Sequence, residues 1–395
     1  MLKGKNIVLG VTGGIAAYKA CDIASRLVKL GADVHVIMTK AACEFVAPLT
    51  FKTLTGNKVH TSVFDENDTG VPHIDLAQGA DLLLVAPATA NFIAKAANGI
   101  ADDMLSTTIL AASNKKIIIS PAMNSHMYEN KAVQDNLKTL MGRGFVVIKP
   151  DSGRLACGAE GIGKLPDPCD IVERVVSELC FKKNLVGKRV LITAGPTREK
   201  IDPVRYITNH STGKMGYALA RVAKAKGASV TLVTGKTNIK KPLGVDVIEI
   251  VSAKDMFREV TERYQDTDIV IKAAAVADFK PKNVSDSKTK KDNANLCIEL
   301  EKTDDILKHL GQKKDKQILV GFCMETENLI ENAQKKLQSK NLDMICANSL
   351  NVPGAGFAFD TNVLTLIEKD GKVTELPIDT KENLAAIILD KISEM

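Results

Sequence analysis

Short apolar runs separated by amphipathic stretches follow one another along the whole chain of 395 residues. Two of these runs, at residues 4–14 and 187–197, have similar sequences, and each leads to glycine, as a buried parallel strand that feeds a loop does. A helical pattern and a second apolar run follow each of them, the second run lying at residues 31–38 and 227–233. The repeat predicts two strand–helix–strand units with a boundary near residues 180–184.

The remaining patterns extend this arrangement through both halves. Apolar runs predict further parallel strands at residues 82–86, 116–120 and 145–148, and at residues 245–250, 268–273, 318–322, 344–347 and 363–367. Helical patterns lie at residues 16–30, 326–339 and 381–392. The alternation predicts the α/β class, with two doubly wound, Rossmann-like three-layer domains of mainly parallel sheet at residues 1–183 and 184–395. Ligands of such sheets bind beyond the carboxyl ends of the strands.

The composition excludes several classes of protein. Hydrophobic residues make up 45% and charged residues 25%, as is ordinary for a folded soluble domain. The net charge is only +6, and aromatic residues make up 4% with no Trp, so we expect no nucleic-acid partner. Apolar runs stay below the roughly 20 residues of a membrane span, and the first residues lead into a strand rather than a signal peptide. We therefore expect a cytoplasmic protein with no membrane partner. The eight cysteines form no Cys-x-x-Cys pair, which excludes a zinc ribbon or a thioredoxin motif.

The turn after the first strand reads Thr-Gly-Gly-Ile-Ala-Ala at residues 12–17 and opens a helix, so its backbone N–H groups suit a phosphate. A nicotinamide dinucleotide site usually needs an acidic residue at the end of the second strand to bind the ribose. That strand ends in Ile-Met-Thr-Lys at residues 37–40, which contains no acid, and Thr39 is placed instead to bind a monophosphate. A two-domain nicotinamide oxidoreductase is therefore a disfavoured rival hypothesis.

Two further motifs follow predicted strands: Ala-Pro-Ala-Thr-Ala-Asn at residues 86–91 and Pro-Ala-Met-Asn-Ser-His-Met-Tyr at residues 121–128. Together with the glycine turn they resemble the FMN-dependent cysteine decarboxylases over residues 1 to about 180. The resemblance implies an FMN site formed by Gly13, Gly14, Ile15, Ala16, Thr39, Pro87, Ala88, Thr89, Ala90 and Met123. Two positions depart from the family: Gly14 stands where Ser is common, and Tyr128 stands where some relatives have Trp.

The same resemblance implies three catalytic residues. His73 would be the catalytic histidine, Asn124 would hold the substrate carboxylate, and Cys157 would lie on a glycine-rich flap at residues 153–163 and donate a proton. Alone, such a histidine is more often a surface residue and such a cysteine a small buried side chain, so the hypothesis depends on the flanking motifs. The implied chemistry oxidises a cysteinyl thiol to a thioaldehyde with FMN and releases carbon dioxide to give an enethiolate. That product is then reduced by a hydride from the reduced flavin and a proton from Cys157.

The second half carries a longer segment between its first strand and helix, around residues 198–211, which runs into Asn-His-Ser-Thr-Gly-Lys-Met-Gly at residues 209–216. This motif lacks the glycine spacing of a P-loop and does not directly follow a strand, so P-loop phosphate binding is not expected. Residues 272–279 end a strand and place Asp278 on the ligand-binding rim, where contact with Mg²⁺ or a ribose is plausible. The lysine-rich stretch at residues 280–291 fits either a solvated loop or a clamp for a triphosphate.

These segments resemble the phosphopantothenate–cysteine ligases across residues 187–395. The resemblance implies a nucleotide site formed by Lys272, Ala273, Ala274, Asp278, Lys288, Asp304, Asp305, Ile306, Leu307, Phe322, Lys336 and Lys340. Asn209 would hold the acyl-nucleotide intermediate, Lys288 would assist the second step, and Asp278 would be a ligand of Mg²⁺. Residues 303–306 read Thr-Asp-Asp-Ile, where the family usually has Asn-Pro-Asp-Ile.

The order of the two halves matches bifunctional bacterial enzymes of coenzyme A biosynthesis, in which the second half makes the substrate of the first. The resemblance implies 4'-phosphopantothenate, L-cysteine and CTP as substrates, 4'-phosphopantetheine as the final product, and a homo-oligomer with a trimer-based decarboxylase and a dimeric ligase. A non-catalytic flavin- or nucleotide-binding regulatory protein is the other rival. The presence of His73, Asn124, Cys157, Asn209 and Lys288 argues against it.

Overall fold

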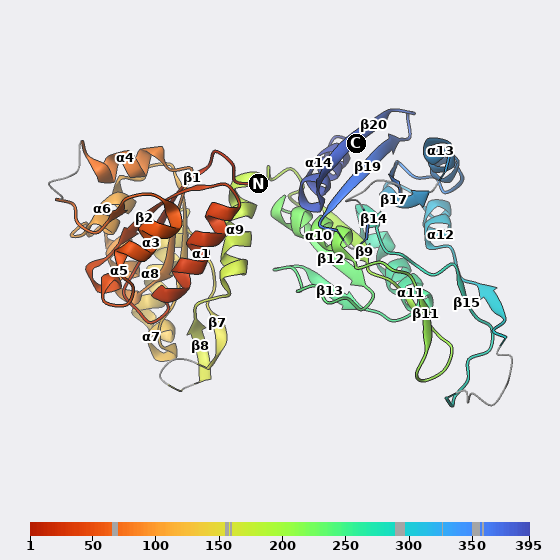
Figure 1. The fold of residues 1–395 in the computed structure, drawn as a ribbon, viewed down its shortest axis with the longest axis horizontal. Coiled ribbons are helices and arrows are strands. Elements are labelled where there is room, and N and C mark those ends of the chain that lie inside the picture. The colour runs from red at the N-terminus through yellow and green to blue at the C-terminus, as the bar shows by residue number, and fades with distance from the viewer. Residues whose placement is uncertain are drawn as a thin grey trace. The chain divides into compact units, whose positions relative to one another are not determined.

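The computed structural model describes residues 1–64, 70–154, 158, 160–288, 297–325, 327–349, 356–357 and 359–395 (Figure 1). The chain divides into two compact units, Met1–Cys180 and Phe181–Met395, and each is described by itself. Within the described residues, no helix has the length and apolar character needed to cross a bilayer.

The first unit contains a six-stranded, entirely parallel sheet in the order β3-β2-β1-β4-β5-β6. Its strands are β1 (Asn6–Val11), β2 (Asp33–Met38), β3 (Val59–His60), β4 (Leu82–Ala88), β5 (Lys116–Pro121) and β6 (Val146–Val147). All seven residues of β4 are buried, as expected for a central strand that is covered on both faces. A separate antiparallel hairpin is formed by β7 (Asp151–Arg154) and β8 (Glu160–Lys164).

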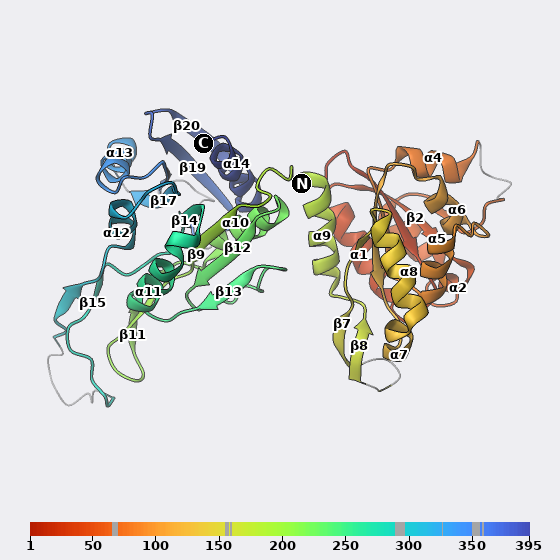
Figure 2. The same cartoon turned by 180° about the vertical axis from the view of Figure 1, so that it is seen from behind.

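Helices cover both faces of this sheet (Figures 1 and 2). One group consists of α1 (Ala17–Lys29), α3 (Pro48–Thr55) and α9 (Pro168–Cys180), and the other of α4 (Pro72–Gly79), α5 (Ala90–Asn98), α6 (Met104–Ala111) and α8 (Lys131–Gly142). The short helices α2 (Lys40–Cys43) and α7 (Ser125–Glu129) follow β2 and β5. In α1 the apolar residues recur every three or four positions and form one buried stripe of Ala17, Ala20, Ile23, Ala24 and Leu27.

The second unit is built on an eight-stranded sheet in the order β13-β12-β9-β14-β17-β18-β19-β20. The first six strands are parallel: β13 (Asp246–Glu249), β12 (Ser229–Thr234), β9 (Arg189–Ala194), β14 (Ile269–Lys272), β17 (Ile318–Glu325) and β18 (Met344–Ser349). Strands β19 (Thr361–Glu368) and β20 (Val373–Thr380) are antiparallel. Both units thus have the predicted α/β class with mainly parallel sheets.

Two buried clusters, one on each face, hold the layers of this second unit together. One joins the sheet to α10 (Lys214–Ala225) and α14 (Lys381–Ser393), and the other joins it to α11 (Ala253–Arg263), α12 (Ile306–Gln312) and α13 (Leu329–Ser339). A 3-10 turn, η1 (Tyr264–Asp266), follows α11. Two small antiparallel pairs lie beside the sheet: β10 (Arg198–Lys200) with β11 (Tyr206–Thr208), and β15 (Phe279–Pro281) with β16 (Leu300–Lys302).

One sequence prediction was wrong. The apolar run at residues 363–367 was expected to form a parallel strand, but β19 pairs antiparallel with β18. Hydrophobic periodicity reports burial and not strand direction. A parallel neighbour requires a crossover connection of a dozen or more residues, usually with a helix, and the chain passes from Ser349 to Thr361 in fewer.

Candidate active sites

The first candidate site lies at the carboxyl edge of the first unit's sheet, at the switch point between β1 and β4. From β1 the strand order runs to β2 and β3 on one side, and from β4 it runs to β5 and β6 on the other. Ligands of open parallel sheets bind at the point where the strand order reverses in this way. The residues predicted to bind FMN all belong to this edge. Thr39 follows β2; Gly13, Gly14, Ile15 and Ala16 follow β1; Pro87, Ala88, Thr89 and Ala90 end or follow β4; and Met123 follows β5.

A buried threonine joins the turns after β1 and β4. The Thr12 hydroxyl donates to the Pro87 carbonyl at 2.8 Å and accepts from the Thr89 N–H at 3.0 Å. The side chain is 1% exposed, so losing it would leave two backbone groups without a partner. Thr12 therefore fixes the separation of two segments that are far apart in sequence and were both predicted to contact FMN.

The two glycines of the first turn have different surroundings. A Cβ on Gly13 would overlap the side chain and backbone of Ala41, so only glycine fits there. A Cβ on Gly14 would meet only the Thr89 methyl, at 3.8 Å, so a serine would fit. Helix α1 then begins at Ala17, its N-cap residue Ala16 makes no side-chain capping hydrogen bond, and a helix N-terminus of this kind suits an anion such as a phosphate.

The three residues predicted to be catalytic in this unit lie on different elements. His73 is in the first turn of α4, which packs against α6 and β1, and its buried Nδ1 lacks a hydrogen-bond partner within the described part of the chain. Asn124 begins α7, where its Oδ1 accepts from the His126 N–H at 2.9 Å. Cys157 lies outside the described residues.

The β7–β8 hairpin lies directly against the segment that carries Asn124. The Met123 N–H donates to the Gly163 carbonyl at 3.0 Å. A Cβ on Gly163 would overlap the Met123 carbonyl oxygen, and one on Gly161 would overlap the Ser125 hydroxyl. Gly163 also has a φ of +138°, a conformation that favours glycine. These two glycines therefore permit the close approach, and the predicted flap at residues 153–163 ends on β8, the strand packed beside Asn124.

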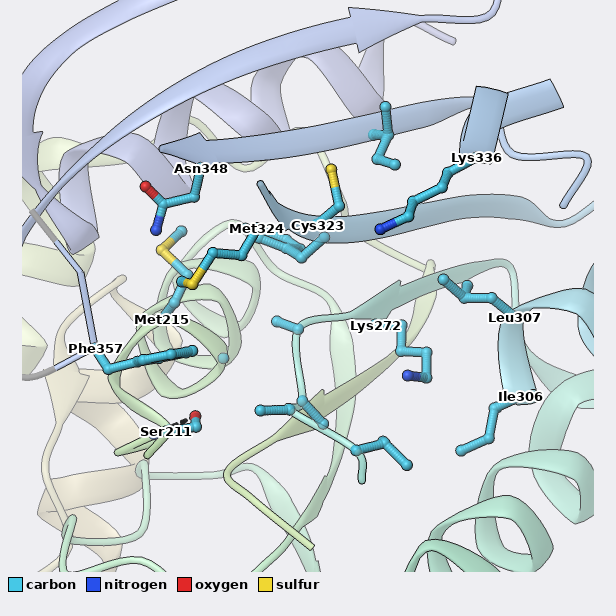
Figure 3. Close-up of a pocket in the computed structure, with 18 of the residues that line it drawn as sticks. Ser211, Met215, Lys272, Ile306, Leu307, Cys323, Met324, Lys336, Asn348 and Phe357 are labelled. Atoms are coloured by element: carbon cyan, nitrogen blue, oxygen red, sulfur yellow. Dashed lines mark hydrogen bonds between the residues drawn. The ribbon is translucent and has the colours of Figure 1, made fainter. Parts of the chain in front are cut away.

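The second candidate site is a cavity of about 370 Å³ at the carboxyl edge of the second unit's sheet (Figure 3). The end of β14, the start of α12, β17, α13 and residues 211–216, which lead into and begin α10, all contribute to its lining. Every residue predicted for the nucleotide site except Lys288 lines this cavity. These are Lys272, Ala273, Ala274, Asp278, Asp304, Asp305, Ile306, Leu307, Phe322, Lys336 and Lys340.

Three lysines line this cavity: Lys272 at the end of β14, Lys336 in α13 and Lys340 at the C-terminal cap of α13. Lys336 pairs with Glu325 at 2.6 Å, and Lys340 pairs with Asp305 at 3.0 Å. Burial and the nearby Lys340 lower the pKa of Lys272 to about 8, against the opposing effect of Asp305 and Asp278. When a phosphate binds nearby, the buried ammonium group of Lys272 gains an anionic partner that favours its charged form.

Asn209 and Lys288 lie outside the cavity lining. The Asn209 amide N–H₂ donates to the carbonyls of Ala275 and Val276, each at 3.2 Å, so Asn209 ties the 209–216 motif to the segment that follows β14. Lys288 is exposed and stands next to a part of the chain that the structure does not describe. Asn209 thus contacts two residues of the cavity wall. Lys288 does not line the cavity, unlike Lys272, Lys336 and Lys340.

Sequence reasoning missed the opposite end of the cavity, which is lined by Phe357, Met215 and Asn348 (Figure 3), and it also missed Asn362 in the lining. Both asparagines are about 95% buried (6% and 5% exposed), and the Oδ1 atom of each has no hydrogen-bond partner within the described residues. A buried amide oxygen without a donor is costly, so this end demands a ligand or water that donates hydrogen bonds. The available signal was that Asn348 directly follows the apolar run at residues 344–347.

The structure gives no support to a metal held by the protein alone. Across the described ranges, no group of three or more His, Cys, Asp or Glu side chains is arranged to hold a metal ion. Asp278, the predicted Mg²⁺ ligand, lines the cavity as an exposed side chain. This fits only the mode in which Mg²⁺ contacts one or two carboxylates and otherwise binds substrate phosphates and water.

Comparison with known proteins covers the whole chain. Residues 1–180 match the family described as Flavoprotein, and residues 185–395 match the family described as DNA/pantothenate metabolism flavoprotein C-terminal domain. The chain is 51% identical to the coenzyme A biosynthesis bifunctional protein CoaBC of Bacillus subtilis (strain 168), with 100% of this chain and 98% of that protein covered. It is 46% identical to the protein of the same name from Vibrio cholerae serotype O1, with 100% and 99% covered. A crystal structure of the C-terminal domain of such a protein is 51% identical, covers 54% of this chain and 98% of its own, and has a TM-score of 0.48.

Proposed function

This chain belongs to the family of the coenzyme A biosynthesis bifunctional protein CoaBC, and from this premise we propose which residues carry out its two reactions. The protein is a bifunctional enzyme of coenzyme A biosynthesis, a flavoprotein decarboxylase and a phosphopantothenate–cysteine ligase. We propose that it uses CTP, Mg²⁺ and FMN, and that the residues of its two sites have the following roles.

For the ligase, the observation that supports the proposal best is the convergence of Lys272, Lys336 and Lys340 on one cavity with the start of α12. The carboxylate of 4'-phosphopantothenate would attack the α-phosphorus of CTP, forming an acyl-CMP and releasing pyrophosphate. The cysteine amine would then attack the acyl carbon, forming the amide and releasing CMP. The three lysines would neutralise the triphosphate and the departing pyrophosphate, with Asp278 as a protein ligand of Mg²⁺.

The opposite end of this cavity suits the acyl substrate. The amide oxygens of Asn348 and Asn362, which have no partner in the described part of the chain, are acceptors, so they disfavour a phosphate and favour a group with O–H or N–H donors. Phosphopantothenate carries a hydroxyl and an amide N–H between its phosphate and its carboxylate. Binding in this orientation would leave the carboxylate directed toward the nucleotide at the lysine-lined end.

Asn209 and Lys288 would act in the two half-reactions from outside the cavity lining. Asn209 already holds the carbonyls of Ala275 and Val276, and we propose that it keeps this wall in place around the acyl-nucleotide. We propose that Lys288, an exposed lysine, assists the attack of cysteine by supplying a positive charge.

For the decarboxylase, the turn at residues 13–16 and the uncapped start of α1 would bind the FMN phosphate, and Thr39 would donate its hydroxyl to it. Bound FMN would supply the two-electron redox chemistry that makes loss of carbon dioxide possible. Asn124 would hold the substrate carboxylate, and His73, whose Nδ1 has no partner among the described residues, would exchange a proton with the substrate. Cys157 would deliver the final proton to the enethiolate.

A single reconstitution tests both halves. The purified chain is supplied with 4'-phosphopantothenate, L-cysteine, CTP and Mg²⁺, and the products are analysed by mass spectrometry. We expect the natural chain to form 4'-phosphopantetheine. When FMN is removed, we expect 4'-phosphopantothenoylcysteine to accumulate and no 4'-phosphopantetheine to form. Cys157→Ser should accumulate the enethiol product with normal ligase turnover. Product formation with ATP but not CTP, or full decarboxylase turnover by Cys157→Ser, would contradict the corresponding assignment.

The quaternary structure is also a proposal that rests on family membership. We propose a homo-oligomer in which trimers form the decarboxylase and dimers the ligase. Sedimentation of the natural chain with and without FMN measures this directly. A monomer that binds FMN tightly would overturn the idea of flavin sites shared between subunits.

A further inference from the structure

A lysine that sequence reasoning did not single out is almost fully enclosed beside the ligase cavity. Lys381 begins α14, is 4% exposed, and lines the cavity. Its ammonium group donates to three backbone carbonyls, those of Gly356 at 2.9 Å, Phe359 at 2.6 Å and, at the longer distance of 3.5 Å, Phe357. A lysine has three N–H donors, so these carbonyls account for its hydrogen-bonding capacity.

The carbonyls belong to described residues between β18 and β19 that form the end wall of the cavity. The Phe357 ring lies on the side of Ser211 and Met215, away from Ile306, Leu307 and Lys336 (Figure 3). The Phe357 carbonyl also accepts from the Thr212 hydroxyl at 2.5 Å. The end wall is therefore held from two directions, by Lys381 from α14 and by Thr212 from the segment before α10.

An ion pair strengthens this connection. Lys214, in the first turn of α10, pairs with Asp360 at 2.7 Å, one residue beyond the last carbonyl that Lys381 contacts. Replacing Lys381 by an apolar residue would leave the Gly356 carbonyl buried without its donor and remove one donor from each of the others. The backbone at Phe357 would then be held by Thr212 alone on that side.

We propose that Lys381 is a positioning residue for the acyl-substrate end of the ligase cavity, acting through the backbone that carries Phe357. This inference rests on the proposed function, in which Asn348 and Asn362 face the acyl substrate and the lysine-lined end takes CTP. Because Lys381 lies at the first of these ends, its loss weakens binding of 4'-phosphopantothenate and leaves CTP binding nearly intact.

The experiment measures pyrophosphate release by the full chain, with 4'-phosphopantothenate and CTP varied separately. For Lys381→Met we expect the KM for 4'-phosphopantothenate to rise about tenfold, while the KM for CTP changes less than about twofold. Lys381→Arg, which keeps a charged donor, should recover part of that rise. If Lys381→Met does not fold, Thr212→Val removes the other donor to the Phe357 carbonyl and should give the same KM split.

Lys226 provides the matched control. It is 1% exposed and also contacts α14, through an ion pair with Asp390 at 2.6 Å, but it does not line the cavity. Lys226→Met should lower the Tm without changing either KM. An equal rise in both KM values for Lys381→Met, no rise in either, or the same split for Lys226→Met would overturn the positioning role. Failure of the natural chain to release pyrophosphate would instead refute the proposed function.

Discussion

Nucleotide binding at the ligase cavity should weaken as the pH rises through about 8, because Lys272 loses its charge there. Burial lowers the pKa of this lysine to about 8 in the free protein, from an ordinary value of 10.5. A bound triphosphate favours the charged ammonium, so the pKa of Lys272 rises in the complex and binding takes up a proton. The stabilising charge is therefore present below pH 8 and is lost above it.

The size of the effect follows from the pKa. A group with a pKa of about 8 is about 90% protonated at pH 7, half protonated at pH 8 and about 10% protonated at pH 9. If only the charged lysine supports tight binding, the Kd for CTP rises about tenfold between pH 7 and pH 9, or about 1.4 kcal/mol. At pH 8, binding should take up about half a proton.

Isothermal titration calorimetry of the full chain with CTP and Mg²⁺, without the acyl substrate, measures both quantities. Titrations at pH 7, 8 and 9 in two buffers of different ionisation enthalpy give the Kd and the proton uptake. Lys272→Met is the control, since it should bind more weakly at pH 7 and show no further loss up to pH 9. It also separates Lys272 from Lys381, whose pKa is likewise lowered to about 8 by burial and Lys214. A flat Kd in the natural chain, or an unchanged slope in Lys272→Met, would refute the reasoning.

Three other changes have clear expected outcomes. Gly13→Ala should abolish flavin absorbance in the purified protein because its Cβ overlaps Ala41, whereas Gly14→Ser should keep it; equal flavin content in both would show that the turn does not hold the cofactor. Thr12→Val should lower the free energy of unfolding by about 1–3 kcal/mol, measured by urea denaturation, because two buried backbone groups lose their partner. Lys288→Gln should still release pyrophosphate and accumulate the acyl-CMP in a quenched reaction, detected by mass spectrometry; absence of acyl-CMP would move this lysine to triphosphate binding.

Much of the fold was accessible from the sequence because the relevant signals are local. The run at residues 268–273 is apolar enough to be a buried strand, and it forms β14 at the centre of the second sheet. Since every parallel strand ends at the same edge, a residue such as Ala274 or Asp278 that follows one of them could be assigned to the ligand-binding rim. The sequence therefore placed the motif at residues 272–279 at this edge of the sheet, where several of its residues line the cavity.

The remaining features depend on contacts between segments far apart in the chain. Neither the antiparallel direction of β19 nor the exposure of Lys288 away from the cavity is encoded in periodicity or charge. Likewise, an asparagine such as Asn362 has the same local sequence signal whether its amide is paired or left without a donor in a cavity wall.

What the sequence determined by itself was the class of each element, the order of the strands along the chain and the loops that carry chemistry, because hydrophobic periodicity and turn residues act over a few positions. The tertiary structure decided which of those loops share a cavity. It also decided that Lys381 hydrogen-bonds the backbone of Phe357, from which it is separated by 24 positions in the chain and by strands β19 and β20. Burial and hydrogen-bond satisfaction are set by packing, so only the folded chain defines them.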